Sequence, residues 1–429
     1  MGCSIAVPTA SPGTTRELSV RRNFGWTAAG NAIHAACQWG MVGALAKMSS
    51  AEVVGQYALG VAVTAPIFML AQLNLRSVLA TDVADSHPFR DYRDLRLISI
   101  GVALAATLGL AVAAYSGTES RIIAVMGLLQ VADWCSDIYF GLLQQHEQMD
   151  RIAVSLITRG LTSLTVLAVG MMVTHDLTVS LLAVLLCRAC VYFAYDSRIA
   201  VRGILAEAGS RSRPRRTNRA LLLRTALPLG FVMMAGSLSG NIPRYFITHE
   251  LNTYALGIFA ALASLTQAGN MVVNALGQAA TPRLAKRFAA RDFSLFRRLT
   301  TWLVLLGASL GVGGVLLSLT AGQRVLLILF RPEYAEHTAL LAVLCGGAGL
   351  GFVASMLGYA ITAARRFREQ MPIQVASVAA SAATAFFLVP RMGLTGAALA
   401  LAAAPVVQTL GELRVLRDAL RAPVGKAAL

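Results

Sequence analysis

Apolar segments of about 20 residues recur along almost the entire chain. Each is long enough to cross the roughly 30 Å hydrocarbon core of a bilayer as a helix. Within hydrocarbon, backbone N–H and C=O groups must bond one another, so such segments have to be helical. The sequence therefore predicts an all-α integral membrane protein with about twelve transmembrane helices. We place them at about 25–46, 53–75, 97–115, 121–143, 152–174, 177–197, 226–247, 254–278, 299–319, 338–363, 372–389 and 394–413.

The composition supports this prediction. The 429 residues are 56% hydrophobic and only 14% charged, whereas soluble domains carry about 25% charged residues. A formal net charge of +16 would suit a nucleic-acid-binding protein, but the apolar composition argues against that class. In membrane proteins, excess Lys and Arg mark cytoplasmic loops and their contacts with anionic lipid. We therefore expect anionic membrane lipids as partners, and no nucleic acid.

The basic residues also predict the orientation and the domain boundaries. The most basic segment, 198–224, joins the sixth and seventh predicted helices. Because basic loops face the cytoplasm, this segment and both termini should lie there. The predicted units are a cytosolic N-terminal tail (1–24), a first six-helix bundle (25–200), a basic cytosolic linker (201–224), a second six-helix bundle (225–415) and a cytosolic C-terminal tail (416–429).

The two halves resemble each other. The stretch 55-GQYALGVAVTAP-66 is similar to 257-GIFAALASLTQA-268, with Gly55 matching Gly257 at an offset of 202. Six helices in each half give both halves the same polarity in the membrane. The expected fold is therefore two parallel-repeat six-helix bundles around a central cavity, the arrangement that often encloses a substrate site.

Polar residues spaced three or four apart share one face of a helix. Three predicted helices carry such stripes, whereas those at 299–319, 372–389 and 394–413 have almost none. Hydrogen bonding between helices explains a single stripe, but three stripes favour a water-filled cavity. We expect this substrate-binding cavity to be lined by Asn31, His34, Gln38, Ser237, Asn241, Arg244, Gln267, Asn270, Asn274 and Gln278.

Arg244 is the most informative of these residues. It follows Pro243 inside an apolar segment, and a central arginine is penalised by roughly 2.5–3.5 kcal/mol during membrane insertion. Proline tends to kink the helix, which would help to aim the guanidinium into the cavity. We also expect Gly236 and Gly240 to let this face approach a neighbouring helix closely.

Four further charges lie within predicted membrane helices: Asp133, Asp137, Arg159 and Arg188. The favoured interpretation is that they pair with one another and support folding. The alternative is a site that binds a coupling cation or proton.

The cysteines do not indicate a cofactor. Cys187 and Cys190 form a lone C-x-x-C in an apolar segment with no second ligand pair. Small buried residues are the simpler interpretation. We expect no metal site, no cofactor and, since the G-x-x-x-x-G-K-[ST] motif does not occur, no nucleotide-driven step.

The chain resembles the Wzx-like oligosaccharide flippases, the polysaccharide-transporter branch of the multidrug/oligosaccharidyl-lipid/polysaccharide exporter superfamily. The segments that carry this resemblance are 22–60, 137–164, 228–262 and 282–285, with 155-SLITRG-160 as an S-x-x-x-R-G element and N-I-P-R-Y-F around Arg244. The resemblance implies a V-shaped cavity that opens alternately to either side. Lipid II flippases share this fold but usually carry several arginines in the first two helices, which this sequence lacks.

The resemblance also implies a cargo and a location. The cargo would be an undecaprenyl-pyrophosphate-linked oligosaccharide, moved to the outer leaflet of a bacterial inner membrane for surface polysaccharide biosynthesis. The protein would not be an enzyme, and a polysaccharide polymerase complex would be a partner. Arg244 would suit the cationic cavity that is typical of this family, and Arg159 would occupy the S-x-x-x-R-G element.

Two alternatives stay open. A drug or metabolite exporter of the same fold would need acidic and aromatic residues in the cavity. A membrane glycosyl polymerase or ligase would need a large outer loop with catalytic groups, and the longest expected outer segment is 320–337.

Overall fold

The computed structural model describes residues 20–81, 87–200 and 219–421. Every regular element within these residues is helical, which confirms the prediction of an all-α protein. Parts of the predicted tails (1–19 and 422–429) and of the predicted linker (201–218) lie outside the described residues.

The first half consists of α1 (Val20–Met48), α2 (Ala51–Ala71), α3 (Leu75–Thr81), α4 (Phe89–Ala114), α5 (Gly117–Gln145), α6 (Met149–Thr174), α7 (Leu177–Val191), the π-helix η1 (Tyr192–Asp196) and α8 (Ser197–Ala200). The second half consists of α10 (Arg219–Glu250), α11 (Thr253–Leu265), α12 (Gln267–Ala289), α13 (Phe293–Leu329), α14 (Pro332–Ala335), α15 (Thr338–Ala363), α16 (Phe367–Met392) and α17 (Leu394–Arg421). We call helices α1 to α8 the N-lobe and helices α10 to α17 the C-lobe.

The described residues contain 11 helical stretches that are long and apolar enough to cross a membrane. Helix α1, with 29 residues, is long enough to be the twelfth. Its hydropathy is lower because Asn31, His34 and Gln38 lie within it. The predicted spans therefore agree with the observed helices.

Two details differ from the prediction. The predicted span 254–278 is divided at Thr266 into α11 and α12. Hydroxyls of Ser264 and Thr266 donate to the carbonyls of Ala261 and Ala263, both at 2.7 Å, and such bonds compete with the regular helical ladder. The expected outer segment 320–337 is mostly helical, since α13 continues to Leu329 and α14 follows. It therefore leaves little room for a catalytic loop.

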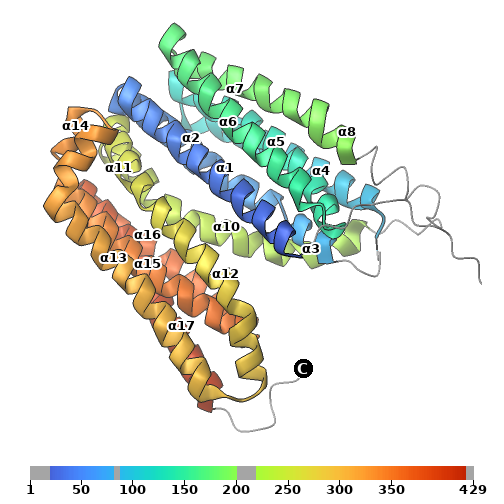
Figure 1. The fold of residues 1–429 in the computed structure, drawn as a ribbon. Coiled ribbons are helices and arrows are strands. Elements are labelled where there is room, and N and C mark those ends of the chain that lie inside the picture. The colour runs from blue at the N-terminus through green and yellow to red at the C-terminus, as the bar shows by residue number, and fades with distance from the viewer. Residues whose placement is uncertain (1–19, 82–86, 201–218, 422–429) are drawn as a thin grey trace, which may run out of the picture.

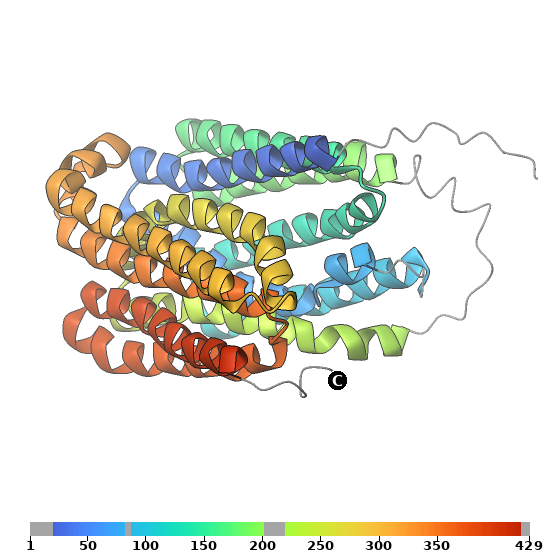
Figure 2. The same cartoon turned by 60° about the horizontal axis from the view of Figure 1, so that its bottom comes forward.

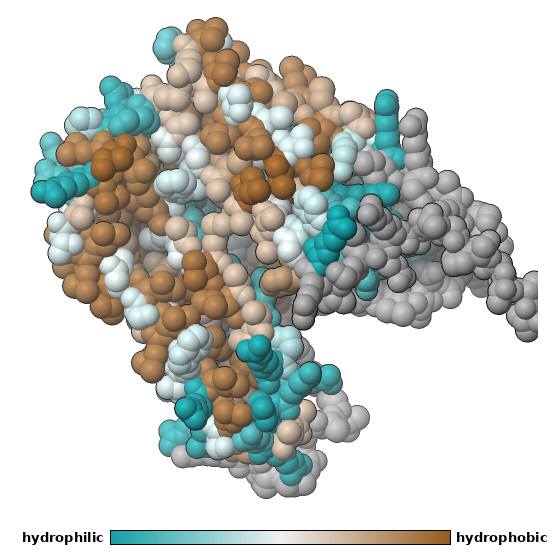
Figure 3. Space-filling view, in the orientation of Figure 1, coloured by the Kyte–Doolittle hydropathy of each residue, from teal (hydrophilic) through white to brown (hydrophobic). Residues whose placement is uncertain are grey.

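The two lobes meet at one end and diverge toward the other (Figures 1 and 2). We call these the closed end, which carries α14 and the start of α11, and the splayed end, which carries α3, α8 and the end of α17. Apolar residues cover the flanks of both lobes, and hydrophilic residues gather at their ends (Figure 3). This distribution is the one that a bilayer around the middle of the molecule requires.

At the closed end, the lobes touch through a reciprocal contact between α2 and α11. A Cβ atom built on Gly55 would lie 1.8 Å from the carbonyl oxygen of Thr253, and one on Gly257 would lie 1.7 Å from that of Ala51. Residues 51 and 55 correspond to 253 and 257 at the offset of 202. A contact in which each residue meets the partner's equivalent is typical of a two-fold axis. The similarity of the two stretches thus reflects a parallel structural repeat, and both glycines are required by the close approach.

Candidate functional site

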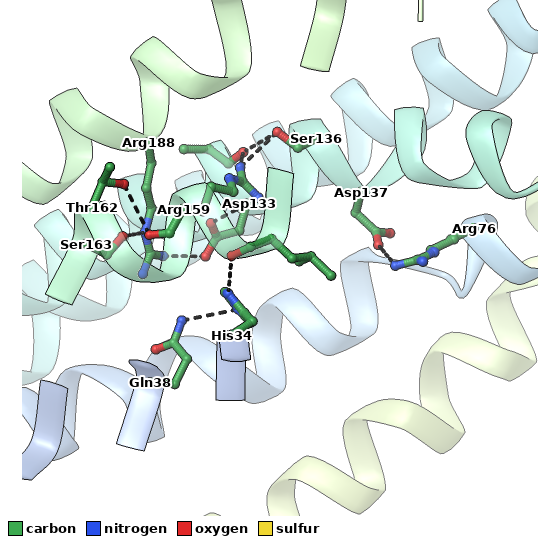
Figure 4. A network of polar contacts seen from close by, with 12 residues as sticks. His34, Gln38, Arg76, Asp133, Ser136, Asp137, Arg159, Thr162, Ser163 and Arg188 are labelled. Atoms are coloured by element: carbon green, nitrogen blue, oxygen red, sulfur yellow. Dashed lines mark hydrogen bonds and ion pairs between the residues drawn. The ribbon is translucent and has the colours of Figure 1, made fainter. Parts of the chain in front are cut away.

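The polar stripe of α1 is divided between two environments. Asn31 is exposed, whereas His34 and Gln38 are half-buried. His34 Nδ1 lies 3.2 Å from the carbonyl oxygen of Leu156 on α6 and donates to it. Gln38 Nε2 lies 3.5 Å from His34 Nε2. His34 therefore faces α6, and Gln38 bonds to His34 (Figure 4). Asn31 stays accessible.

Beside His34, Asp133 is shared by two arginines (Figure 4). Its carboxylate lies 2.5 Å from Arg188 Nη1 and 3.6 Å from Arg159 Nη1. Arg159 also donates to Ser136 Oγ at 2.8 Å, and Arg188 donates to Ser163 Oγ at 3.1 Å. Both arginines are buried, and each has an ionic and a neutral partner. This geometry fits the interpretation that these charges stabilise one another.

Asp137 forms a second ionic group with arginines that the sequence did not single out as its partners. Its carboxylate lies 3.3 Å from Arg76 Nη1 and 3.0 Å from Arg96 Nη2. Arg96 is fully buried, and its guanidinium lies 5.6 Å from the centre of the Trp134 ring. Both arginines lie just outside the predicted spans, Arg76 directly after 53–75 and Arg96 directly before 97–115. Helix α4, however, begins at Phe89 and carries Arg96 into the packed lobe.

The α10 stripe forms a hydrogen-bonded chain along its own helix. Asn241 Nδ2 donates to the carbonyl oxygen of Ser237 at 2.8 Å, and Arg244 Nη1 donates to Asn241 Oδ1 at 3.2 Å. The next residue, Tyr245, donates its hydroxyl to the carbonyl oxygen of Ala62 on α2. The stripe therefore ends beside a contact between α10 and the N-lobe helix α2.

Arg244 differs from the N-lobe arginines because it has no ion pair within the described part of the chain. Its Nε is enclosed and bonds to none of the described residues. Asn241 is the one hydrogen-bond partner of this guanidinium among the described residues, so most of its donors lack a protein partner. An unpaired guanidinium in a membrane-spanning helix is a candidate binding group for an anion.

The expectation for Gly236 and Gly240 is wrong. A Cβ atom on Gly240 would meet nothing within 4 Å, and one on Gly236 would meet only Gln374 Nε2, at 3.9 Å. Both glycines are exposed, because α10 packs against α2 and α16 through its other faces. This part of α10 borders open space and makes no tight helix contact.

The α12 stripe is accessible because the opposite side of α12 packs against α15. Gly269 lies under the Phe352 ring and Gly277 lies under the Tyr359 ring, with Cβ positions 2.3 and 2.1 Å from ring atoms. Gln267, Asn274 and Gln278 are exposed, and Asn270 is half-buried. Asn270 donates to Gln267 at 3.3 Å, and Asn274 accepts from the Tyr359 hydroxyl at 3.2 Å.

The C-lobe contains a cavity of about 570 Å³ that the sequence did not predict. Its lining includes Asn274 of the α12 stripe and four polar residues of α16 and α17: Gln370, Gln374, Gln408 and Glu412. The expectation that these two helices carry almost no polar residues is wrong. Two pairs of polar residues spaced by four, Gln370 with Gln374 and Gln408 with Glu412, share a helix face. They could have indicated this cavity from the sequence.

A second, basic pocket lies at the splayed end of α12. Arg283, Lys286 and Arg287 line it together with Leu295 and Leu299 of α13, and its volume is about 540 Å³. Three cations beside two apolar side chains match the chemistry of an anionic lipid, whose headgroup is charged and whose chains are apolar.

At the closed end, polar bonds join the lobes. Lys47 Nζ donates to carbonyls at the C-terminus of α13, those of Leu327 and Ile328 and that of the following residue Phe330, at 3.3, 3.2 and 3.1 Å. A lysine at a helix C-terminus satisfies free carbonyls and complements the helix dipole. A second bond runs from the C-lobe to the N-lobe: Arg331 Nη1, just before α14, donates to the carbonyl oxygen of Ser49, just after α1, at 3.2 Å. These bonds would have to break for the closed end to open.

Within the described residues, no group of three or more His, Cys, Asp and Glu side chains is placed to hold a metal ion. Cys187 is half-buried, whereas Cys190 is exposed, which differs from the expectation that both are buried.

The sequence matches a known family. The profile described as Polysaccharide biosynthesis protein covers residues 20–288, more than half of the chain. Over 383 residues, the chain is 26% identical to the capsular polysaccharide biosynthesis protein CapF of Staphylococcus aureus, with 88% of this chain and 94% of that protein covered.

Solved transporters share the fold. The lipid II flippase MurJ in an inward closed conformation gives a TM-score of 0.72 at 10% identity, covering 91% of this chain and 87% of that one. An inward-facing multidrug resistance MATE family transporter of the MOP superfamily gives 0.71 at 13% identity, covering 95% and 97%. An outward-facing MATE structure gives 0.62 at 13% identity, covering 94% and 96%. Of these two MATE structures, the inward-facing one therefore has the higher TM-score.

Proposed function

Since this chain belongs to the polysaccharide biosynthesis protein family, we propose that it is a flippase for a lipid-linked oligosaccharide. It would move an undecaprenyl-pyrophosphate-type cargo from the inner to the outer leaflet of a bacterial inner membrane, for surface polysaccharide biosynthesis. The observation that carries this proposal is the pair of lobes joined at one end and diverging toward the other (Figure 1), together with the exposed polar residues of α12. Such a surface suits a hydrophilic glycan whose lipid tail stays in the bilayer.

Two groups of cations suit the pyrophosphate. The basic pocket of Arg283, Lys286 and Arg287 lies at the splayed end, where a cargo from the cytoplasmic leaflet would arrive if the splayed end faces the cytoplasm. Arg244, deeper in the membrane, has donors without a protein partner. A guanidinium binds phosphate through paired hydrogen bonds, which a lysine does not reproduce. The cargo would thus move from the first group toward the second.

Transport would proceed by alternating access. The described state is closed where Lys47 and Arg331 join the lobes, and this end would face the periplasm. The closing bonds go to backbone carbonyls, so they can break and reform without a change of protonation. With a negative interior, outward movement of each negative charge is favoured by roughly 2.3 kcal/mol per 100 mV. The protein itself would carry out no chemistry, and a polymerase complex would receive the cargo outside.

A deletion strain tests this proposal. Without the protein, lipid-linked oligosaccharide should accumulate in the membrane and surface polysaccharide should be lost. Expression of the wild-type chain should reverse both changes. Unchanged polysaccharide in the deletion strain, together with lost resistance to small toxic compounds, would instead favour an exporter of the same fold.

A further inference from the structure

The cavity of about 570 Å³ in the C-lobe has a carboxyl group without an ionic partner. Glu412 of α17 is only 7% exposed, and its Oε2 bonds to none of the described residues. Its Oε1 lies 3.2 Å from where a Cβ atom on Gly358 would stand, so the glycine leaves space beside the carboxyl group. A buried carboxyl group without a partner is costly, and at this place it faces a cavity of the size that holds a small ligand.

The rest of the lining supplies amides, hydroxyls and one aromatic ring. Gln408 Nε2 donates to Gln374 Oε1 at 2.8 Å, which uses one end of each amide and leaves the other end for a ligand. Tyr359 presents its ring, and its hydroxyl is fixed by the bond to Asn274 at 3.2 Å. Apolar side chains, among them Leu229 and Val232, complete the lining. Together these groups can bind hydroxyls while they pack against C–H groups. The one acidic and one aromatic side chain of this lining lie among four amides, which differs from the acidic and aromatic lining expected of a drug exporter.

We propose that this cavity binds a sugar residue of the cargo, with Glu412 accepting hydrogen bonds from sugar hydroxyls. The inference rests on the proposed function and adds to it a division of tasks. The glycan is recognised in the C-lobe cavity, whereas the pyrophosphate is bound by cations elsewhere. A carboxyl group suits this division, because it accepts bonds from hydroxyls and, when ionised, repels phosphate.

The position of the cavity fits this role. Thr362 and Gln370 lie in the last turn of α15 and the first turn of α16, so the cavity reaches the splayed end of the C-lobe. Asn274 belongs both to the cavity and to the exposed α12 stripe. A Cβ atom built on the exposed Gly236 of α10 would meet only Gln374 Nε2 within 4 Å, so there is space beside this glutamine. A glycan between the lobes could therefore enter without movement of a helix.

The test compares two ligands on the purified full-length protein in lipid nanodiscs. One probe is undecaprenyl pyrophosphate, and the other is the glycan-bearing lipid extracted from the deletion strain. Wild-type protein should bind the glycan-bearing lipid more tightly. The Kd for undecaprenyl pyrophosphate divided by the Kd for the glycan-bearing lipid measures sugar recognition. Glu412→Gln should reduce this ratio by roughly 10- to 100-fold, the effect of losing hydrogen bonds to a carboxylate, and Gln374→Leu by roughly 2- to 10-fold, the effect of losing neutral hydrogen bonds. The Kd for undecaprenyl pyrophosphate should stay unchanged.

The matched control is Glu369→Gln. Glu369 lies at the same end of the C-lobe but pairs with Arg366 and does not line the cavity, so this change should leave the ratio as in wild type. If the wild-type preference persists in both cavity variants, the sugar is recognised elsewhere and the inference is wrong. It is also wrong if both probes weaken equally, or if Glu412→Gln stops transport with the ratio intact. Wild-type protein that binds neither probe would overturn the proposed function itself.

Discussion

The charged residues within the membrane helices fall into two kinds. Asp133 and Asp137 each join two arginines of the N-lobe, so these charges are compensated inside the protein. Arg244 has one neutral partner, Asn241. A buried charge whose partner is removed destabilises the fold, whereas a charge that awaits a ligand contributes to binding. The two kinds should therefore respond differently to substitution.

Substitution of Arg244 should impair transport and leave the protein folded. Arg244→Ala and Arg244→Glu should lower transport by roughly 10- to 100-fold or more, since charge-assisted hydrogen bonds to the pyrophosphate are lost. Arg244→Lys should retain part of the activity, because it keeps the charge but not the paired donors. The measurement is complementation of a flippase-null strain, with membrane abundance followed by immunoblot. Full activity of Arg244→Ala at normal abundance would show that this arginine binds no cargo.

Substitution in the Asp133 group should have the opposite effect. Asp133→Asn leaves two buried arginines without their shared carboxylate, and a destabilisation of about 1–2 kcal/mol suffices to change cellular abundance several-fold. Membrane levels should fall several-fold, and activity per molecule should stay close to wild type. Arg121→Gln, at an exposed site near the closed end, is the control and should be neutral. Normal abundance with abolished transport would identify the group as a coupling site.

The residue-level predictions from sequence succeeded only in part, for a physical reason. Spacing shows which residues share a helix face, but not what that face meets. It grouped His34 with Asn31, although α1 packs against α6 and turns His34 toward Leu156. It missed the cavity at Glu412, because this depends on how α16 and α17 lie side by side.

The crossing of α2 and α11 is the most constrained contact between the lobes. Gly55→Ala and Gly257→Ala would each push a methyl group into backbone of the other helix. Overpacking of this kind costs roughly 1–3 kcal/mol, so both variants should unfold at lower temperature. Gly240→Ala is the matched control: it has open space around it and gains helix propensity of up to about 1 kcal/mol. Thermal unfolding of the purified protein measures all three. Equal stability of the three variants would contradict the close crossing.

The helices themselves were largely predictable, because hydrocarbon permits few alternatives to a helix of sufficient length. The predicted spans and the repeat with an offset of 202 agree with the observed elements. The division between α11 and α12 was not predictable from hydropathy, since it involves the hydroxyls of Ser264 and Thr266. A hydropathy profile does not show that side-chain hydroxyls compete with backbone N–H groups for carbonyl oxygens at this point.

The arrangement of the whole molecule in the membrane is tested by its topology. Fusions of a reporter after Thr118 and after Arg216 should report opposite sides, with the second in the cytoplasm. Thr118 lies at the start of α5, and Arg216 lies outside the described residues. A periplasm-active reporter such as alkaline phosphatase should work after Thr118 only. Activity of both fusions on one side would contradict the helix count and the assignment of the splayed end.

The central claim is that this chain moves a glycan-bearing lipid across a bilayer. The most direct measurement uses purified protein in liposomes whose inner leaflet holds the lipid-linked oligosaccharide from the deletion strain. An external lectin that cannot enter the liposomes detects the glycan as it reaches the outer leaflet. Wild-type protein should bring the glycan to the lectin much faster than protein-free liposomes do, and Arg244→Ala should not. A rate for wild-type protein equal to that of protein-free liposomes, with the protein folded and inserted, would contradict the account.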